Sequence, residues 1–335
     1  MTSPFVYWKL PNQAEVYTLQ NIKINTVAFP NFNEEGFLFF PFEKSREAYF
    51  LSGKIKEVAQ FSEDLTFYKN KKNANKKNFS INYNLDSEIY KKLIKSAISE
   101  MDKGTFKKVV LARKCTQSLP QFFDLKILFD QLCNAYQRAF VYVIKIENEV
   151  WIGATPELLL KKEAHFFLTN ALAGTKSENA FGEKEKQEQL LVKNYILDLL
   201  NKSDCKSIQV SELKELNTGN LVHLINEVQF ETDNPEKVLS LLHPTPAVCG
   251  TPLIEAQKFI QENENLERNY YSGYLGPIQS DKNFSLWVNL RCANISENEI
   301  SYYSGAGIIA ESDADKELLE TERKMDTLRK FVNSL

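Results

Sequence analysis

The chain has 335 residues, of which 43% are hydrophobic and 25% charged, and its net charge is −3. This composition is typical of a globular protein with a sizeable core, and the slightly acidic balance argues against a nucleic-acid partner. No apolar run reaches the roughly 18 residues that a membrane helix needs, and the N-terminal segment lacks the pattern of a signal peptide, so we expect no membrane association.

The cysteine and histidine counts limit the kinds of metal and redox chemistry. The five cysteines are odd in number and far apart, without a C-x-x-C pair, which indicates reduced thiols and a cytoplasmic location. Only three histidines occur, so we do not expect a histidine-rich metal site. A metal ion here would be a hard cation bound by oxygen.

Residues 68–84 are rich in lysine and asparagine and indicate a solvated surface loop. A helix is predicted after it over 86–104, with Asp86 or Ser87 as its cap and Gly104 at its end. Residues 106–114, "FKKVVLARK", alternate as a strand. That strand places four side chains on one face: Phe106, Lys108, Val110 and Ala112.

Strand-like runs outnumber helical patterns in the rest of the chain. The strand-like runs cover 140–154, 165–174, 284–296 and 299–307, and the helical patterns cover 183–201, 252–263 and 313–333. Because the strands often follow one another directly, with short turns, they favour a mixed, largely antiparallel α+β architecture over a regular βαβ series.

The segment G-A-G-I-I-A, residues 305–310, matches the G-x-G-x-x-A spelling of a dinucleotide-binding turn. A strand-like run precedes it, but the next helical pattern begins only near Ser312 to Asp315. Too few residues follow Gly307 for the further parallel strands of a nucleotide-binding sheet. We therefore reject the dinucleotide interpretation.

The predicted helix after this turn carries acids and bases on one face. Ser312 is the expected N-cap, and Glu317, Glu320 and Lys324 recur at i, i+3 and i+7. A solvated stripe is the alternative to a functional site. The more obvious buried stripe of this helix contains Leu318, Met325 and Leu328, so the acidic face would border the core.

Two further glutamates are candidates for chemistry. Glu157 lies between a proline and a leucine run, where partial desolvation would raise its pKa and suit it to donate a proton; a surface turn is the alternative. Glu188 precedes an apolar run on the 183–201 helix, and here the alternative is a surface pair with Lys184.

Three other segments are typical of anion binding or of a positioned side chain. Backbone N–H groups around Gly174 and Thr175 in "LAGTK" form a candidate anion nest. His243 lies in a rigid, proline-rich loop, although a lone histidine is more often structural. Arg291 lies in an apolar strand and needs a buried carboxylate from the protein or from a ligand.

Seven segments together resemble the chorismate-utilising enzymes, and within them the isochorismate synthases of menaquinone and siderophore pathways. In chain order these segments are "KVVLAR", "GATPELLL", "LAGTK", "HPTPAVCGTP", "YYSGYLGPI", "LRCA" and "SGAGI" followed by "LLETERK". The resemblance covers 85–335 closely, as the catalytic core, and the part before it, 1–84, more faintly. It implies one large α+β domain over 1–335, with two packed, mainly antiparallel sheets and helices outside.

The resemblance also implies Mg²⁺-dependent isomerisation of chorismate to isochorismate. Lys108 would be the general base that activates water for attack at C2, and it must be uncharged, a state that burial and a nearby cation favour. Glu157 would be the general acid that protonates the departing C4 hydroxyl. Glu188 and Glu320 match the magnesium carboxylates, with Glu317 nearby as a direct or water-mediated ligand.

The remaining implied roles concern the two carboxylates of chorismate. The side chains of Arg291, Lys324 and Tyr271, with the backbone around Gly174 and Gly305, would hold them. His243 would face the ring near the leaving hydroxyl. Chorismate is the bound molecule that the resemblance implies, and we expect a monomer or a weak dimer.

Family members divide by chemistry. Amine-forming relatives generally carry glutamine where Lys108 stands, and some use a lysine where this chain has Ala173, so the pair indicates addition of water. Salicylate synthases share the lysine, and their loop near Ala247 and Val248 tends to be more polar. Salicylate formation, amine formation and a degenerate, non-catalytic chorismate-binding subunit stay as alternatives. Two departures from the family pattern are Gln189, where histidine is usual, and a short segment after "GTK".

Overall fold

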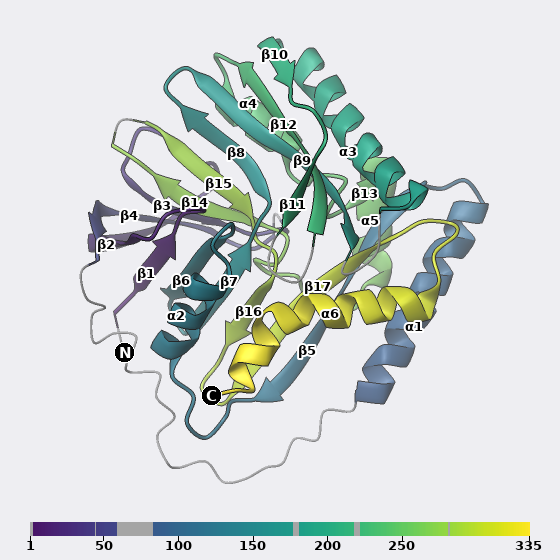
Figure 1. Ribbon diagram of the computed structural model, residues 1–335, viewed down its shortest axis with the longest axis horizontal. Coiled ribbons are helices and arrows are strands. Elements are labelled where there is room, and N and C mark those ends of the chain that lie inside the picture. The colour runs from purple at the N-terminus through teal and green to yellow at the C-terminus, as the bar shows by residue number, and fades with distance from the viewer. Residues whose placement is uncertain (1–2, 44, 59–82, 177–180, 218–221, 281) are drawn as a thin grey trace.

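The computed structural model describes residues 3–43, 45–58, 83–176, 181–217, 222–280 and 282–335. Nearly all of the lysine- and asparagine-rich segment 68–84 lies outside these residues. The described strands are all connected through antiparallel pairings in one 17-stranded sheet. Within the described residues, six helices lie outside this sheet (Figure 1).

The sheet consists of two half-sheets that are joined where β1 pairs with β2. The first half-sheet contains, in spatial order, β13 (Gly250–Thr251), β5 (Lys108–Ser118), β17 (Glu299–Ile308), β16 (Cys292–Ile295), β7 (Glu149–Thr155), β6 (Phe140–Ile146) and β1 (Phe5–Lys9). The second contains β2 (Val16–Val27), β4 (Ala48–Glu57), β3 (Gly36–Phe40), β14 (Tyr274–Ile278), β15 (Phe284–Val288), β8 (Leu158–Glu163), β9 (Phe166–Lys176) and β12 (Val222–Glu231). Strands β10 (Lys206–Val210) and β11 (Lys214–Asn217) both pair with β12.

Aromatic side chains fill the space between the half-sheets. Phe140 of β6 stacks on Trp287 of β15 with ring centroids 4.0 Å apart, and Trp8 of β1 contacts Phe37 of β3 at 5.2 Å. All four are buried. Burial of such large side chains is the main source of stability where two sheets pack face to face.

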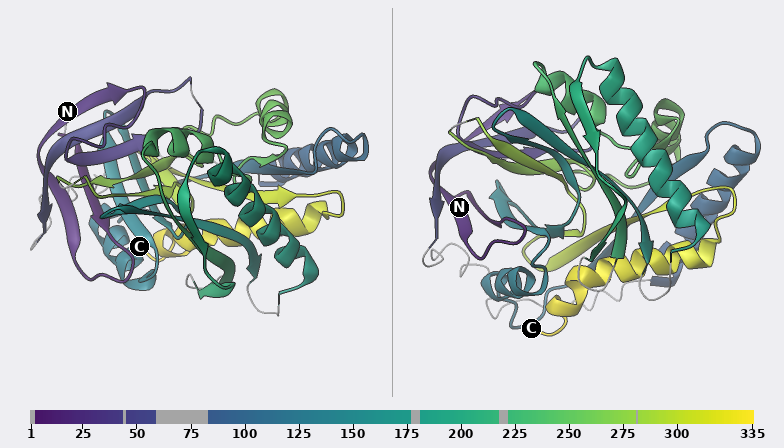
Figure 2. Two further views of the ribbon diagram at one scale, coloured as in Figure 1. Left: turned by 90° about the horizontal axis from the view of Figure 1, so that it is seen from above. Right: turned by 45° about the horizontal axis from the view of Figure 1, so that its top comes forward.

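The helices cover the outer faces (Figures 1 and 2). Helices α1 (Tyr83–Asp102) and α5 (Leu253–Asn263) pack on β5, α2 (Leu125–Ala135) on β6 and β7, and α6 (Ala314–Val332) on β16 and β17. Helix α3 (Glu183–Lys202) packs on β9 and β12, and α4 (Pro235–Leu242) on β8. Figure 2 shows α3 and α6 on neighbouring flanks of the sheet. No described helix is both long and apolar enough to cross a membrane.

The expectation of an antiparallel α+β fold with helices outside is confirmed. Some local expectations differ from the structure. Helix α1 begins at Tyr83, so Asp86 lies in its first turn instead of capping it. Phe106 precedes β5 and packs with Val109 and Leu111, on the opposite face from Lys108. Asp313 caps α6 by accepting from the Lys316 N–H.

Candidate active site

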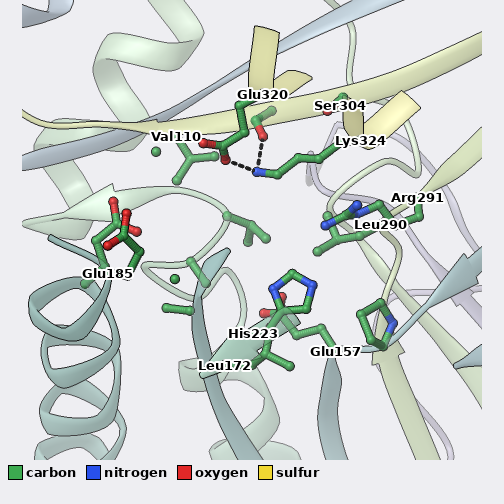
Figure 3. A pocket seen from close by; sticks show the side chains of 18 of the residues that line it. Val110, Glu157, Leu172, Glu185, His223, Leu290, Arg291, Ser304, Glu320 and Lys324 are labelled. Carbon is green, nitrogen blue, oxygen red and sulfur yellow. Dashed lines mark hydrogen bonds and ion pairs between the residues drawn. The ribbon is translucent and has the colours of Figure 1, made fainter. Parts of the chain in front are cut away.

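A pocket opens where both half-sheets approach α3 and α6 (Figure 3). Its lining comes from β5, the β7–β8 connection, β9, α3, β12, the loop before β13, β17 and α6. Nine of the residues predicted for function line it: Lys108, Glu157, Gly174, Glu188, Tyr271, Arg291, Gly305, Glu320 and Lys324. Segments more than two hundred residues apart in the sequence therefore meet at one place.

Lys108 is the first residue of β5, and its side chain is 4% exposed. It lies beside Gly307 of the neighbouring β17, where a Cβ atom would be 3.0 Å from Lys108 Cε and 3.7 Å from Glu188 Oε1. Glycine at 307 thus leaves room for an amine and a carboxylate from two distant elements. The geometry brings a buried amine next to one of the acidic groups of α3.

Glu157 lies in the connection between β7 and β8 and is 6% exposed. Its backbone carbonyl accepts from the Val288 N–H at 2.9 Å, and the Thr155 hydroxyl donates to the Val288 carbonyl at 2.6 Å. These bonds fix the connection against β15. Burial raises the pKa of Glu157 from 4.5 to about 7, although Lys108, Arg291 and Lys324 act in the opposite direction. The carboxyl is therefore largely protonated below pH 7 and about half protonated at pH 7, which suits it to act as a general acid.

Two cationic side chains face the pocket from other elements. Arg291, just before β16, has a φ of +48° and a guanidinium that donates to Thr327 Oγ1 at 3.5 Å. Burial lowers its pKa, so a negative ligand would favour its charged form. Lys324 of α6 pairs with Glu320 at 2.6 Å and donates to the Gly305 carbonyl at 2.9 Å (Figure 3).

Figure 3 shows Glu185 on the side of the pocket away from Arg291, and Glu320 between them beside Lys324. Glu185 and Glu188 lie one turn apart on α3, and Glu320 comes from α6. Next to Glu188, the buried Gln189 donates to Asn226 of β12, whose own amide donates to the Ser211 carbonyl. These contacts hold α3 against the sheet and so fix where its carboxylates lie.

Gly174 lets α3 approach β9 closely. It has a φ of +69°, and a Cβ atom there would be 2.9 Å from both Cβ and the carbonyl oxygen of Glu185. Only glycine adopts this backbone without a steric cost and without pushing the start of α3 away. Thr175 continues β9 and its backbone is paired with His223, while its side chain lies outside those described.

The lining can be tested for its fit to a magnesium ion. Among the described residues, no three carboxylate, imidazole or thiol groups are close enough to hold a metal by themselves. Mg²⁺ is usually held by one or two carboxylates and completes its shell with water and substrate oxygens. Glu188 and Glu320 supply that type of ligand from two helices, with Glu185 beside them. The residues fit a hard cation whose coordination the substrate completes.

Two predicted residues do not line the pocket. His243 donates from Nε2 to the Ser272 carbonyl at 2.8 Å and contacts the rings of Phe42 and Tyr274 edge-on. It therefore supports the turn that carries Tyr271 and does not itself face the cavity. Glu317 is 3% exposed and accepts from the Ser312 hydroxyl at 2.8 Å, at the start of α6.

Sequence reasoning missed His223 of β12, a buried histidine that does line the pocket. Burial and the charges of Arg291 and Lys324 hold its pKa well below 6.5, so it stays neutral and can only exchange hydrogen bonds. Little in the sequence indicated that His223 lines a pocket, because a single histidine in the strand-like run "LVHLINEV" looks the same as a residue of the core. Glu185 was also missed, and its place one turn before Glu188 was the available clue.

Comparisons with known proteins show the family to which the chain is similar. The family model described as "Chorismate binding enzyme" matches residues 43–333. The vibriobactin-specific isochorismate synthase of Vibrio cholerae is 28% identical over 259 residues, covering 72% of this chain and 66% of that protein. The isochorismate synthase DhbC of Bacillus subtilis is 26% identical, covering 72% and 67%. The matched segments thus span about two thirds of these relatives.

Solved structures extend the similarity of fold to nearly the whole chain. MenF, the menaquinone-specific isochorismate synthase of Escherichia coli, superposes with a TM-score of 0.81 at 21% identity, covering 99% of this chain and 89% of that one. Anthranilate synthase component I of Streptococcus pneumoniae gives 0.71 at 16% identity, covering 97% and 90%. At such identities the likeness concerns the fold.

Proposed function

The chain belongs to the chorismate binding enzyme family, and on that premise we propose that it is an isochorismate synthase, an isomerase that acts on chorismate with Mg²⁺. One observation carries the proposal: a buried amine, Lys108, and a buried carboxyl held protonated, Glu157, line the same pocket as carboxylates from two helices. The names of the relatives support the same reaction and either a siderophore or a menaquinone pathway.

Lys108 and Glu157 have complementary roles in the proposed reaction. Lys108 takes a proton from a water molecule as that water attacks C2, and Glu157 gives its proton to the C4 hydroxyl, which leaves as water. The ring double bonds shift accordingly, so the product is an isomer of the substrate. A bound Mg²⁺ would supply charge neutralisation at a substrate carboxylate, and Glu188 and Glu320 would hold it.

Charge complementarity supports a substrate with two carboxylates. Arg291 and Lys324 offer cationic donors, and neutral His223 adds hydrogen-bonding capacity without a charge. Lys108 and Ala173, both in the lining, favour water over ammonia as the nucleophile, as the family resemblance implies. The apolar Ala247 and Val248 are consistent with a reaction that stops at isochorismate.

The test is an assay of the purified protein with chorismate and Mg²⁺, with and without ammonium. Products are separated by chromatography, and pyruvate is followed enzymatically. Isochorismate without pyruvate is the expected result. Salicylate with pyruvate, or an ammonium-dependent amine product, would assign the chain to another reaction of the family, and no turnover would indicate a non-catalytic chorismate-binding subunit.

A further inference from the structure

A buried ion pair lies directly behind the pocket and belongs to none of the groups assigned so far. Glu264 follows the end of α5, and Arg268 comes four residues later in the chain; the two side chains are 1% and 0% exposed. Arg268 donates from Nε to Glu264 Oε1 at 2.7 Å and from Nη2 to Oε2 at 2.8 Å. This bidentate geometry fixes the plane of the guanidinium.

The guanidinium also bridges two walls of the pocket. Its Nη1 donates to the Val248 carbonyl at 2.9 Å, and its Nη2 donates to the Val110 carbonyl at 2.7 Å. Both valines line the pocket, Val110 on β5 and Val248 in the loop before β13. One planar group thereby sets the spacing between the strand that carries Lys108 and the proline-rich loop.

The Glu264–Arg268 pair is also connected to a third segment of the pocket lining, the turn that carries Tyr271, through a backbone hydrogen bond. The Arg268 carbonyl accepts from the Tyr271 N–H at 2.9 Å, in the turn whose next residue, Ser272, has a φ of +62° and is held by His243. Glu264 Oε2 also accepts from the Ala112 N–H at 2.8 Å, a second contact with β5. Three segments that converge on the pocket are therefore tied to one ion pair.

A contribution to folding stability alone does not explain why a buried ion pair lies at this position. Two well-packed apolar residues in place of a buried ion pair often leave a protein as stable or more so, because desolvation of both charges offsets their attraction. What an apolar pair lacks is a set of directional donors for two carbonyls. We propose that Glu264 and Arg268 are positioning residues, which hold the walls that carry Lys108, Val248 and Tyr271 in register; this inference rests on the proposed function.

The test uses Arg268→Lys, which keeps the charge opposite Glu264 but cannot reach both carbonyls and both carboxylate oxygens at once. Arg329→Lys is the control, because the Arg329 guanidinium also forms two ion pairs, with Glu322 and Asp326 at 2.7 Å each, but it is 14% exposed and neither partner lines the pocket. Both variants are measured by initial rates, thermal unfolding and amide hydrogen exchange.

We expect Arg268→Lys to unfold at a lower temperature than the control, because it leaves buried acceptors without donors, yet to stay folded at the assay temperature. It should lose on the order of 100-fold in kcat, the loss typical of a displacement of about 1 Å. The KM for Mg²⁺ should not change, because α3 and α6 carry the proposed ligands. Amide exchange should accelerate in 108–112, 245–249 and 268–273 and not elsewhere. If Arg268→Lys does not fold, Glu264→Asp, which keeps the charge opposite Arg268 but shortens its reach, replaces it with the same expectations.

Three outcomes would overturn the inference. They are a kcat equal to that of Arg329→Lys, unchanged exchange in the three segments, or a rate loss accompanied by faster exchange throughout the chain, which is the signature of a merely structural pair. If the unmodified protein forms no isochorismate, the proposed function is wrong. Exchange confined to the three segments would then still support the positional role, and unchanged exchange would refute it.

Discussion

At the scale of single residues, the proposed division of labour depends on a large fraction of Glu157 being protonated near neutral pH. Its pKa of about 7 lies above the ordinary value of 4.5, so between these values the folded chain keeps a proton that the unfolded chain releases. Stability therefore falls as pH rises from about 4.5 to 7, by roughly 3 kcal/mol in total.

Glu157→Gln should remove this loss of stability at higher pH, and it should also remove the proton that the general acid donates. The variant should be more stable than the unmodified protein at pH 8, by up to about 3 kcal/mol, and equally stable at pH 4.5, while its kcat falls on the order of 100- to 10,000-fold. Denaturant titrations at both pH values and initial rates measure this. Glu163→Gln, at the largely exposed end of β8, is the control. An unchanged pH dependence of stability would contradict the raised pKa.

Lys108→Gln tests the base. A glutamine fills much of the same space but accepts no proton, so we expect a normal fold by circular dichroism and a loss of isochorismate formation of at least about 100-fold. The exposed neighbour in Lys107→Gln should keep full activity. A Lys108→Gln variant that still makes isochorismate at the normal rate would exclude Lys108 from the base role.

The metal proposal makes its own prediction for Glu320→Gln. Loss of one carboxylate charge should weaken Mg²⁺ binding by tenfold or more, since hard cations bind by charge as well as by geometry. Titration calorimetry with Mg²⁺ and chorismate measures this. Asp315→Asn, on the same helix and 79% exposed, serves as the control. An identical Mg²⁺ dependence in both variants would remove Glu320 from the ligand set.

At the scale of elements, the position of α3 depends on a glycine in another element. Gly174→Ala would put a Cβ atom 2.9 Å from the Glu185 carbonyl oxygen, at a φ of +69°. We expect a loss of about 1–3 kcal/mol in stability and weaker Mg²⁺ binding, because α3 carries Glu188.

Gly104→Ala separates the steric collision of the added Cβ atom from the backbone strain of a positive φ. Gly104 has a φ of +81° but no atom within 4 Å of the added Cβ position, so this variant has the backbone strain without the collision. Its Mg²⁺ affinity should be normal. If Gly174→Ala weakens Mg²⁺ binding no more than Gly104→Ala does, close approach of α3 to β9 is not what places the carboxylates.

Elements with a long, regular pattern were predictable from the sequence, whereas two of the shorter helices were not. The pattern over 183–201 corresponds to α3 and that over 313–333 to α6 within a residue or two. Helices α2 and α4 were missed, although Asp124 and Asn234 cap them and a proline opens α4. A single cap before 8 to 11 residues is a weak signal beside the strand-like runs around it.

The site was partly predictable for a related reason. Residues in distinctive motifs, such as Glu157 and Arg291, were identified as candidates and line the pocket. His223 was missed, because the sequence of one strand does not indicate which residues the neighbouring strands place beside it. His243 stood out among prolines, but the structure gives it a supporting contact with the Ser272 carbonyl. Motifs identify unusual residues, whereas pairings far apart in the chain decide which of them meet.

At the scale of the whole molecule, the pocket depends on both half-sheets, since β5 and β17 belong to the first, and β9 and β12 to the second. The β1–β2 pairing and the aromatic core between them join these halves. The chain has three tryptophans, and all of them, Trp8, Trp151 and Trp287, lie in this core. Tryptophan fluorescence therefore reports on the junction, while far-ultraviolet circular dichroism reports on all helices and strands.

We expect the two signals to change together during unfolding in denaturant, because neither half-sheet can keep its inner face buried alone. Phe140→Ala removes the ring that stacks on Trp287 and should cost about 3–5 kcal/mol, lowering both midpoints equally. Phe122→Ala, at a position 73% exposed, should leave both unchanged. A fluorescence transition that precedes the loss of circular dichroism would show that the halves separate before they unfold. The pocket would then be lost at that earlier step, and activity measured in low denaturant should follow the fluorescence.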